Sequence, residues 1–431
     1  ERLSHMRSSP RYFRAKARVK RFFRRFSFGE SLIQSVSQLK NRIKSALLKE
    51  SIFEIMGFRY FGPADGNDIT VVCDLLNEAK LVEGPVVVHF KTTKGKGYFR
   101  SESEPSSFHG VSAFDVVTGI SKKKESVSFS QVFGSAMCAL GEEDARVCAI
   151  TAAMEGGTGL IDFAERFPSR FFDVGIAEEH AVTMSSAMAT TGMLPVCAIY
   201  STFLQRTYDQ LIHDVAIQGN HVVFAIDRAG LVGEDGETHQ GIFDLSFLST
   251  VPGMRIFAPA SHAELNTALR RALYECSGPV AVRYSRGCEL TYREDSMAHN
   301  ASVVRDGSDV TLISYGILLN EVIAAADLLA AEGISAEIVK LNELTGVPSE
   351  VIASVRKTGC VVVAEECVAA GGFAQKIASE LSEKSIFPRA FCAVNLGDRF
   401  IPQGSVRELY TRYGIDAAGI ANAARKALHH E

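Results

Sequence analysis

The sequence lacks the features of a membrane protein or of a common nucleic-acid-binding domain. It has no run of about 18 apolar residues, so it offers no candidate transmembrane helix. Its basic beginning is not followed by the continuous apolar segment of a secretory signal peptide. It has no zinc-finger spacing, basic zipper or aromatic RNA-binding motif. We therefore expect neither a membrane nor a nucleic acid as a partner. The first residue is Glu1 rather than Met, so we expect a processed or partial chain.

Cysteine motifs that would indicate disulfides or a metal are also missing. The chain has nine cysteines, an odd number, and no C-x-x-C pair. Cys148, Cys197 and Cys392 lie in apolar runs, where a free thiol packs as a small hydrophobic group. A chain of 431 residues can bury a large core without disulfides. We therefore expect reduced thiols and a cytoplasmic protein.

Charge is unevenly distributed, although the net charge is only −4. Residues 1–50 carry 14 Lys and Arg against 3 Asp and Glu, a net +11, whereas the rest carries 32 against 47, a net −15. A basic arm on an acidic body can contact a nucleic acid or a membrane surface. We favour a solvated surface segment of one or two basic helices that ends near Lys49.

What the chain does have is the composition and alternation of an α/β protein. Apolar residues make up 46% and charged residues 22%, which is typical of globular domains. The length predicts two or three domains. Two polar stretches, 91–127 and 287–308, are interpreted as linkers. They divide the chain into three α/β units in tandem.

Hydrophobic patterns place the elements of these units. The first unit has a short strand over 58–61, a turn at 62–66, a helix over 68–79 with Asp68 near its N-cap, and a buried strand over 86–90. The second has strands over 147–151, 171–174, 195–200, 221–227 and 280–284, with helices over 129–141, 178–191, 205–218 and 262–275. The third has strands over 310–314, 336–340, 361–364 and 391–394, with helices over 319–332, 373–382 and from about 416. This alternation predicts doubly wound parallel sheets.

Polar residues follow several strands of the second unit. Ligands of open α/β sheets gather at the carboxyl ends of the strands. Glu178 opens a helix there, which by itself is also explained by the helix dipole. Tyr200 ends the next strand. Arg228 and Arg286 follow two others and suit a phosphate or carboxylate, which Arg binds bidentately, although solvated surface arginines are equally compatible with the pattern.

Two loops add to this set. The glycine-rich loop over 228–243 carries Asp235 and His239 and suits a backbone folded close to a ligand. In the first unit, a Lys-Gly-Lys-Gly turn that begins at Lys94 is a weak phosphate signal, and a flexible basic loop is an equal alternative. Together these residues indicate a site for a small anionic molecule with acid–base chemistry.

The same residues stand in strings that resemble the 1-deoxy-D-xylulose-5-phosphate synthase family, a transketolase-like group that depends on thiamine diphosphate. The strings in the second unit are ITAAMEGGTGL (150–160), RFFDVGIAEEHAVT (170–183), IYSTFLQRTYDQLIHDVA (199–216) and FAIDRAGLVGEDGETHQGIFDLSFL (224–248). KGKGYF (94–99), FHGV (108–111), EECVAAGGF (365–373) and DRFIPQGS (398–405) extend the resemblance over essentially the whole chain.

The resemblance implies three domains. Residues 1–122 correspond to the C-terminal remainder of a diphosphate-binding domain with a basic helical arm, 123–295 to a pyrimidine-binding domain, and 296–431 to a transketolase C-terminal domain. The family holds Mg²⁺ and the diphosphate with a Gly-Asp-Gly motif and a later Asn. Gly-Asp-Gly does not occur in this sequence. We therefore expect no metal ligand in the chain, and no turnover by the chain alone.

The resemblance also implies a reaction and site residues. The reaction is the condensation of pyruvate with D-glyceraldehyde 3-phosphate, with release of CO2, by a homodimer. Glu178 corresponds to the acid that hydrogen-bonds the aminopyrimidine of the cofactor, and Phe203 to the aromatic ring stacked on it. His109 and His239 correspond to catalytic histidines near the reacting carbon. Residues on the cofactor side are Lys94 and Tyr98, and those on the substrate side are Tyr200, Arg206, Arg228, Asp235 and Arg286.

Two alternatives remain. The chain could be the small subunit of a split transketolase or dehydrogenase, although such a subunit would lack residues 51–122. It could instead be a non-catalytic remnant that binds a partner through its basic arm, although the intact Glu178, His239, Arg228 and Arg286 weigh against decay.

Overall fold

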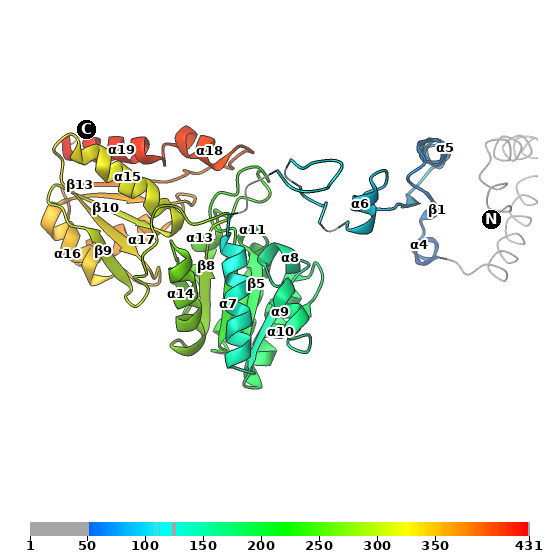
Figure 1. The fold of residues 1–431 in the computed structure, drawn as a ribbon, viewed down its shortest axis with the longest axis horizontal. Coiled ribbons are helices and arrows are strands. Elements are labelled where there is room, and N and C mark those ends of the chain that lie inside the picture. Colours follow the sequence, from blue (N-terminus) through cyan, green and yellow to red (C-terminus); the bar gives the residue numbers. More distant parts are fainter. Residues whose placement is uncertain (1–50, 106, 112, 123–125, 430–431) are drawn as a thin grey trace, which may run out of the picture. The chain divides into compact units, whose positions relative to one another are not determined.

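The computed structural model describes residues 51–105, 107–111, 113–122 and 126–429. The described residues fall into two compact units, one that ends at residue 122 and one that begins at residue 126 (Figure 1). The helices predicted within 1–50 lie outside the described residues. Within the described ranges, no helix is long and apolar enough to cross a membrane.

The first unit is built around a pair of parallel strands. Its elements are α4 (Ile52–Ile55), β1 (Arg59–Asp65), α5 (Ile69–Ala79), β2 (Val86–Lys91) and α6 (Phe99–Ser103). The Asp68 carboxylate caps α5, as predicted, by accepting hydrogen bonds from the backbone N–H groups of Thr70 and Val71.

Two predictions for this unit are wrong. The turn expected at 62–66 lies largely within β1, where a register shift between Phe61 and Ala64 accommodates Gly62-Pro63. Proline is tolerated there because its missing N–H is not needed at an irregularity in the ladder. β2 is only partly buried, because β1 is its one partner strand among the described residues.

The second unit begins with a six-stranded parallel sheet of order β4-β3-β5-β6-β8-β7, which confirms the predicted parallel sheet. The strands are β3 (Val147–Thr151), β4 (Phe171–Asp173), β5 (Leu194–Tyr200), β6 (Val222–Asp227), β7 (Arg255–Phe257) and β8 (Pro279–Arg283). The helices around it include α7 (Phe129–Glu143), α8 (Glu155–Thr158), α9 (Ile161–Arg166), α10 (Glu178–Thr190), α13 (Asp244–Leu248) and α14 (His262–Tyr274).

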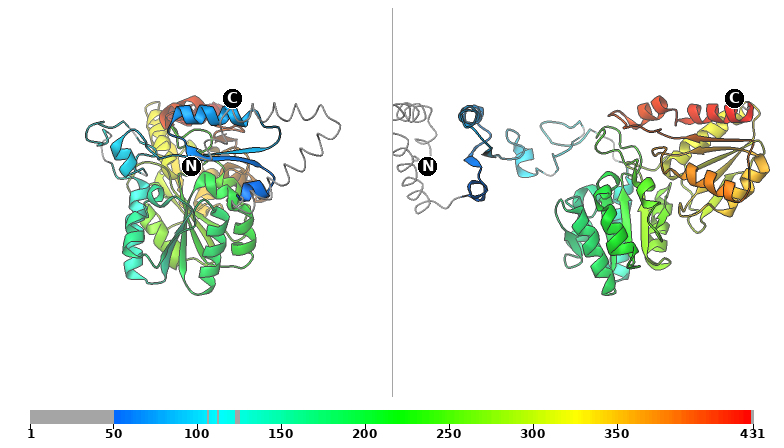
Figure 2. Two further views of the ribbon diagram at one scale, coloured as in Figure 1. Left: turned by 90° about the vertical axis from the view of Figure 1, so that its right-hand side faces the viewer. Right: turned by 180° about the vertical axis from the view of Figure 1, so that it is seen from behind.

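Side chains that alternate along each strand belong to two hydrophobic cores, one on each face of this sheet. On β3, Val147 and Ala149 pack with α7, α9 and α14, whereas Cys148 and Ile150 pack with α10 and with residues 211–215. Successive side chains of a strand point to opposite faces, so a strand covered on both sides is apolar throughout. Figure 2 shows helices on both sides of this sheet, which is coloured green.

The single helix predicted over 205–218 is wrong. The chain turns directly from β5 into α11 (Ser201–Leu204), continues as a 3₁₀ turn (Gln205–Thr207) and α12 (Tyr208–Gln210), and ends in a π-helical segment (Leu211–Ala216). These helix types differ in residues per turn, but each segment has only three to six residues, which is too short for the difference to show in the apolar spacing. As a result, Phe203 and Arg206 lie within two turns of the end of β5.

The second unit continues with a five-stranded sheet of order β13-β12-β10-β11-β9. The strands are β9 (Ala301–Arg305), β10 (Val310–Tyr315), β11 (Ala336–Leu341), β12 (Cys360–Ala364) and β13 (Ala390–Val394), and the helices are α15 (Leu319–Ala330), α16 (Ser349–Thr358), α17 (Phe373–Glu383), α18 (Val406–Tyr413) and α19 (Ala417–His429). β9 runs antiparallel to β11 inside the stretch that was predicted to be a linker. That prediction is wrong because β9 is an edge strand with several partly exposed positions, so its pattern is polar.

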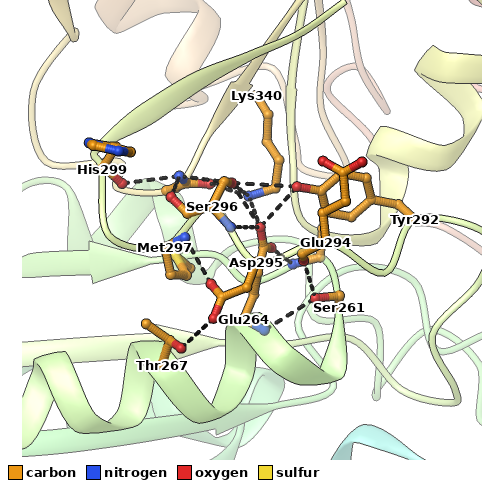
Figure 3. Close-up of polar contacts among 12 residues, drawn as sticks. Ser261, Glu264, Thr267, Tyr292, Glu294, Asp295, Ser296, Met297, His299 and Lys340 are labelled. Atoms are coloured by element: carbon orange, nitrogen blue, oxygen red, sulfur yellow. Dashed lines mark hydrogen bonds and ion pairs between the residues drawn. The ribbon is translucent and has the colours of Figure 1, made fainter.

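A buried ion pair joins the two sheets of this unit. The Lys340 ammonium, on β11, lies 2.8 Å from Glu264 Oε1, on α14, and both side chains are fully buried. Tyr292 and Ser296 also donate hydrogen bonds to this carboxylate oxygen (Figure 3). Burial lowers the pKa of Lys340, and the Glu264 charge opposes that shift. The pair therefore fixes how the five-stranded sheet packs beside α14.

Candidate active site

Four candidate residues lie at or just beyond the carboxyl ends of strands in the six-stranded sheet. Glu178 begins α10 after β4, Tyr200 ends β5, Arg228 follows β6 directly, and Arg286 follows β8 by three residues. Because these strands are parallel, their carboxyl ends lie at one edge of the sheet.

Glu178 is a buried carboxylate paired with a cation, Arg206. The residue is 2% exposed. Its Oε1 lies 2.5 Å from Nη1 of Arg206, whose own side chain is 45% exposed. A buried negative charge requires a positive partner of this kind. The helix dipole at the N-terminus of α10 also stabilises the carboxylate. Arg206, which was predicted on the substrate side, here contacts the predicted cofactor acid.

Phe203 stands between two other candidate side chains. Its ring lies 5.8 Å from the Tyr200 ring at 18° and 5.4 Å from the His239 ring at 75°. The Arg206 guanidinium lies 5.1 Å from the centre of the Phe203 ring. Phe203 therefore links Glu178, through Arg206, to the glycine-rich loop that carries His239.

Hydrogen bonds fix the orientation of His239. Its Nδ1 lies 2.9 Å from the Thr238 hydroxyl, and the Thr202 hydroxyl donates to the Thr238 carbonyl at 2.9 Å. Among the residues that the structure describes, no hydrogen bond is made to the second ring nitrogen, Nε2. A histidine held through one nitrogen is suited to proton transfer through the other.

Arg228 is packed against Tyr200 and largely enclosed. Its guanidinium carbon lies 3.7 Å from the centre of the Tyr200 ring, and its Nη1 donates to the Gly157 carbonyl at 2.9 Å. The side chain is 17% exposed and lies 3.1 Å from a carboxylate oxygen of Asp227. Burial raises the pKa of Asp227 and of Tyr200, and the Arg228 charge opposes both shifts.

Gly157 makes this packing possible. A Cβ atom at Gly157 would lie 1.7 Å from the Tyr200 hydroxyl oxygen. A side chain at this position would therefore displace Tyr200 and, with it, Arg228.

Arg286 is more open than Arg228. Its Nη1 donates to the Val232 carbonyl at 2.8 Å and lies 2.8 Å from Asp235 Oδ2. The side chains of Arg286 and Asp235 are 35% and 36% exposed. Of the two arginines, Arg286 is thus the one with a guanidinium accessible to an incoming anion.

The remaining candidates belong to the first compact unit. The Tyr98 hydroxyl donates to the Val116 carbonyl at 2.9 Å, and its ring packs against Phe108 at 5.5 Å. His109 follows Phe108 in the same loop, and Lys94 lies beyond the end of β2. The cofactor and catalytic roles predicted for Lys94, Tyr98 and His109 stay predictions.

Sequence reasoning missed two buried carboxylates near the site, Asp227 and Glu366. The Ser130 hydroxyl donates to Asp227 at 2.7 Å, and the backbone N–H of Leu231 donates to Glu366 at 2.9 Å. Both follow or end buried strands, which is the signal that could have identified them. In the ranges described above, no group of three or more His, Cys, Asp or Glu is arranged to hold a metal ion.

Three family descriptions match this sequence. "Transketolase, pyrimidine binding domain" matches residues 125–288, "Transketolase, C-terminal domain" matches 299–420, and "1-deoxy-D-xylulose-5-phosphate synthase" matches 1–92. Among solved structures, a split gene transketolase described as an inactive beta4 tetramer superimposes with a TM-score of 0.62 at 29% identity, over 70% of this chain and 99% of that chain. These matches confirm the predicted transketolase-like fold class.

Curated relatives match over nearly the whole chain. It is 44% identical to the 1-deoxy-D-xylulose-5-phosphate synthase of Heliobacterium modesticaldum, over 98% of this chain and 66% of that protein. It is 43% identical to the enzyme of the same name from Desulforudis audaxviator, over 98% of this chain and 68% of that protein. The chain thus spans about two thirds of the length of these relatives. Because of this sequence identity and the matching fold, the chain belongs to the 1-deoxy-D-xylulose-5-phosphate synthase family, whose members are transketolase-type transferases.

Proposed function

We propose that the protein takes part in the thiamine-diphosphate-dependent condensation of pyruvate with D-glyceraldehyde 3-phosphate, which gives 1-deoxy-D-xylulose 5-phosphate and CO2. The observation that supports this most is the buried Glu178 carboxylate, paired with the Arg206 guanidinium that lies over the Phe203 ring, in a chain of this family. The product class would serve isoprenoid, thiamine and pyridoxal synthesis. A homodimer in the cytoplasm is part of the same proposal.

Glu178 and Phe203 fit the pyrimidine half of thiamine diphosphate. A buried carboxylate can hydrogen-bond a ring nitrogen, and the Phe203 ring can pack against a flat heterocycle. When bound, thiamine diphosphate supplies a centre that stabilises a carbanion. Glu178 would orient the pyrimidine ring, and Arg206 would balance the buried charge of Glu178. Lys94 and Tyr98 would contribute to the cofactor side.

Substrate binding is assigned to the arginines and to the loop beside them. Arg286, with its exposed guanidinium, would bind the phosphate of D-glyceraldehyde 3-phosphate, with Arg228 as a second positive group nearby. Tyr200 and Asp235 would contact the rest of the substrate. His239, held through Nδ1, would move a proton at its Nε2, and His109 would be a second proton carrier.

The proposal includes an expectation about the metal. Gly-Asp-Gly, with which the family holds Mg²⁺ and the diphosphate, does not occur in the 431 residues. We therefore assign Mg²⁺ and the diphosphate to residues outside this sequence, and we expect no turnover by the 431-residue protein on its own.

A second candidate is a subunit of a split enzyme. The likeness to a split gene transketolase, which extends over 99% of that chain, favours it. The match of residues 1–92 to the synthase family and the folded segment 51–122 favour the first candidate. In either case the carboxylate Glu178 has the same part in binding the cofactor.

The test is to measure CO2 release from pyruvate with thiamine diphosphate, Mg²⁺ and D-glyceraldehyde 3-phosphate. The 431-residue protein is assayed alone and mixed with the N-terminal third of the Heliobacterium modesticaldum relative. We expect turnover only in the mixture, and loss of it in Glu178→Ala. Turnover by the protein alone would contradict the expectation about the metal. A folded, mixed complex that binds cofactor and releases no CO2 would overturn the proposed reaction.

A further inference from the structure

The glycine-rich loop is a closed segment with a defined base. Gly230 and Gly241 exchange backbone hydrogen bonds of 2.7 and 2.8 Å. Inside the loop, the Gln240 side chain accepts from the Val232 N–H at 2.9 Å. The residues between these ends include Asp235 and His239, so the position of the base decides where those two side chains lie.

A carboxylate from the five-stranded sheet holds this base. Glu366 lies just beyond the end of β12 and is 6% exposed. Its Oε1 accepts a hydrogen bond of 2.9 Å from the backbone N–H of Leu231, and the Tyr410 hydroxyl is its second hydrogen-bond partner. A Cβ atom at Gly230 would lie 2.6 Å from Glu366 Oε2, so the loop backbone packs directly on the carboxyl group.

The contact reaches Arg286 through one further residue. The Val232 carbonyl, next to the Leu231 N–H that Glu366 binds, accepts the 2.8 Å hydrogen bond from Arg286. Two other hydrogen bonds join the loop to residues 402–404, and both are longer. They are the 3.2 Å bond from the Gln240 amide to the Pro402 carbonyl and the 3.4 Å bond from the Gly404 N–H to the Gly233 carbonyl.

We propose that Glu366 is a positioning residue that holds the 230–241 loop, and through it Arg286, Asp235 and His239, in the arrangement that binds the substrate. It does not touch the reacting groups itself. Its assignment to substrate binding rests on the proposed function, whereas its hold on the loop does not. Burial raises the pKa of Glu366, but a protonated carboxyl group still offers an oxygen to the Leu231 N–H.

The neighbouring Glu365 provides a matched control. It is equally buried and follows the same strand, but it accepts hydrogen bonds from the N–H groups of Phe373 and Ala374 at the start of α17. A substitution there disturbs the same sheet without removing the contact to the loop.

The experiment is hydrogen–deuterium exchange of the 431-residue protein, read for the loop 230–241 and, as a reference, for β10–β12. We expect Glu366→Ala to speed loop exchange about tenfold, because one hydrogen bond of the loop base is lost. Glu366→Gln, which keeps an acceptor oxygen, should restore slow exchange. Glu365→Ala, the same change at the neighbouring position, should leave loop exchange unchanged. Tyr410→Phe, which removes only the second partner of Glu366, provides a milder variant and should speed loop exchange less than Glu366→Ala.

Each outcome decides one of the two proposals. Unchanged loop exchange in Glu366→Ala overturns the positioning role. If that variant does not fold, unchanged loop exchange in Tyr410→Phe does so. The same exchange is then repeated with inorganic phosphate. Slower loop exchange in the wild-type protein, lost in Glu366→Ala, supports the link to the anion site. If phosphate changes loop exchange in neither the wild type nor any variant, the anion site of the proposed function is contradicted. The positioning role of Glu366 in the loop is then unaffected.

Discussion

The buried pair of Lys340 and Glu264 gives a prediction whose size follows from its contacts. Lys340→Met removes the ammonium group that lies 2.8 Å from Glu264 Oε1. Within the described residues, no other cation forms an ion pair with Glu264. Removing one partner of a buried pair costs about 3–5 kcal/mol, because the other charge stays buried. Tyr292 and Ser296 still donate to Glu264, so we expect the lower end, about 3 kcal/mol.

The assay is thermal unfolding. For a domain of this size, 1 kcal/mol shifts Tm by about 2 °C, so Lys340→Met should lower Tm by roughly 6 °C. Adding Glu264→Gln should recover part of the loss, because no uncompensated charge remains. Arg270→Ala is the control on the same helix. Its pair with Glu143 is half-exposed on both sides, so the expected loss is at most about 1 kcal/mol. Equal shifts in Lys340→Met and Arg270→Ala, or a double variant less stable than Lys340→Met, would refute the reasoning.

Three further predictions concern the site. Burial raises the pKa of Glu366 to about 7 from 4.5, so the folded protein holds this proton where the unfolded chain releases it. The contribution of this proton to the free energy of unfolding is complete below pH 4.5 and is lost as pH rises through 7, about 3 kcal/mol in all. Over this range, Tm should therefore fall more steeply with pH in the wild type than in Glu366→Gln. Arg286→Ala should raise the KM for D-glyceraldehyde 3-phosphate about 10- to 100-fold in the active mixture, since a charge-assisted hydrogen bond is lost, and an unchanged KM would remove Arg286 from the phosphate site. Gly157→Ala should lower both Tm and activity, because a Cβ there overlaps the Tyr200 hydroxyl. Gly253→Ala, where a Cβ meets no neighbouring atom and only the positive φ of +79° is strained, should lower Tm only.

The regular elements were the predictable part of the fold. Strands such as β3 and β6 are buried at every position because helices cover both faces, so they are largely apolar, and such runs stand out in a sequence. β9 was missed because it lies at an edge, where four of its five residues are partly or fully exposed. The irregular helix after β5 was missed because its segments have only three to six residues each, too few for the different numbers of residues per turn to show in the apolar spacing.

For the candidate site, the sequence predicted the edge of the sheet at which the residues lie, but not which side chains contact one another. Strand ends identify Glu178, Tyr200, Arg228 and Arg286 as neighbours, because parallel strands end together. Side-chain partners depend on rotamers and on distant segments. The pairing of Arg206 with Glu178, and the contact between Glu366 and a backbone N–H 135 positions earlier, have no local signature.

The strand order has a consequence for how the protein folds. β7 precedes β8 in the chain, yet its neighbour in the six-stranded sheet is β8, which lies between it and β6. During synthesis β7 must therefore wait, unpaired, until residues 279–283 have emerged and joined β6. Parallel pairings between distant segments form slowly because the entropy of closing a long loop comes before the contacts. Arg286 follows β8 by three residues, so the arginine assigned to the phosphate reaches its place only after β8 has joined β6.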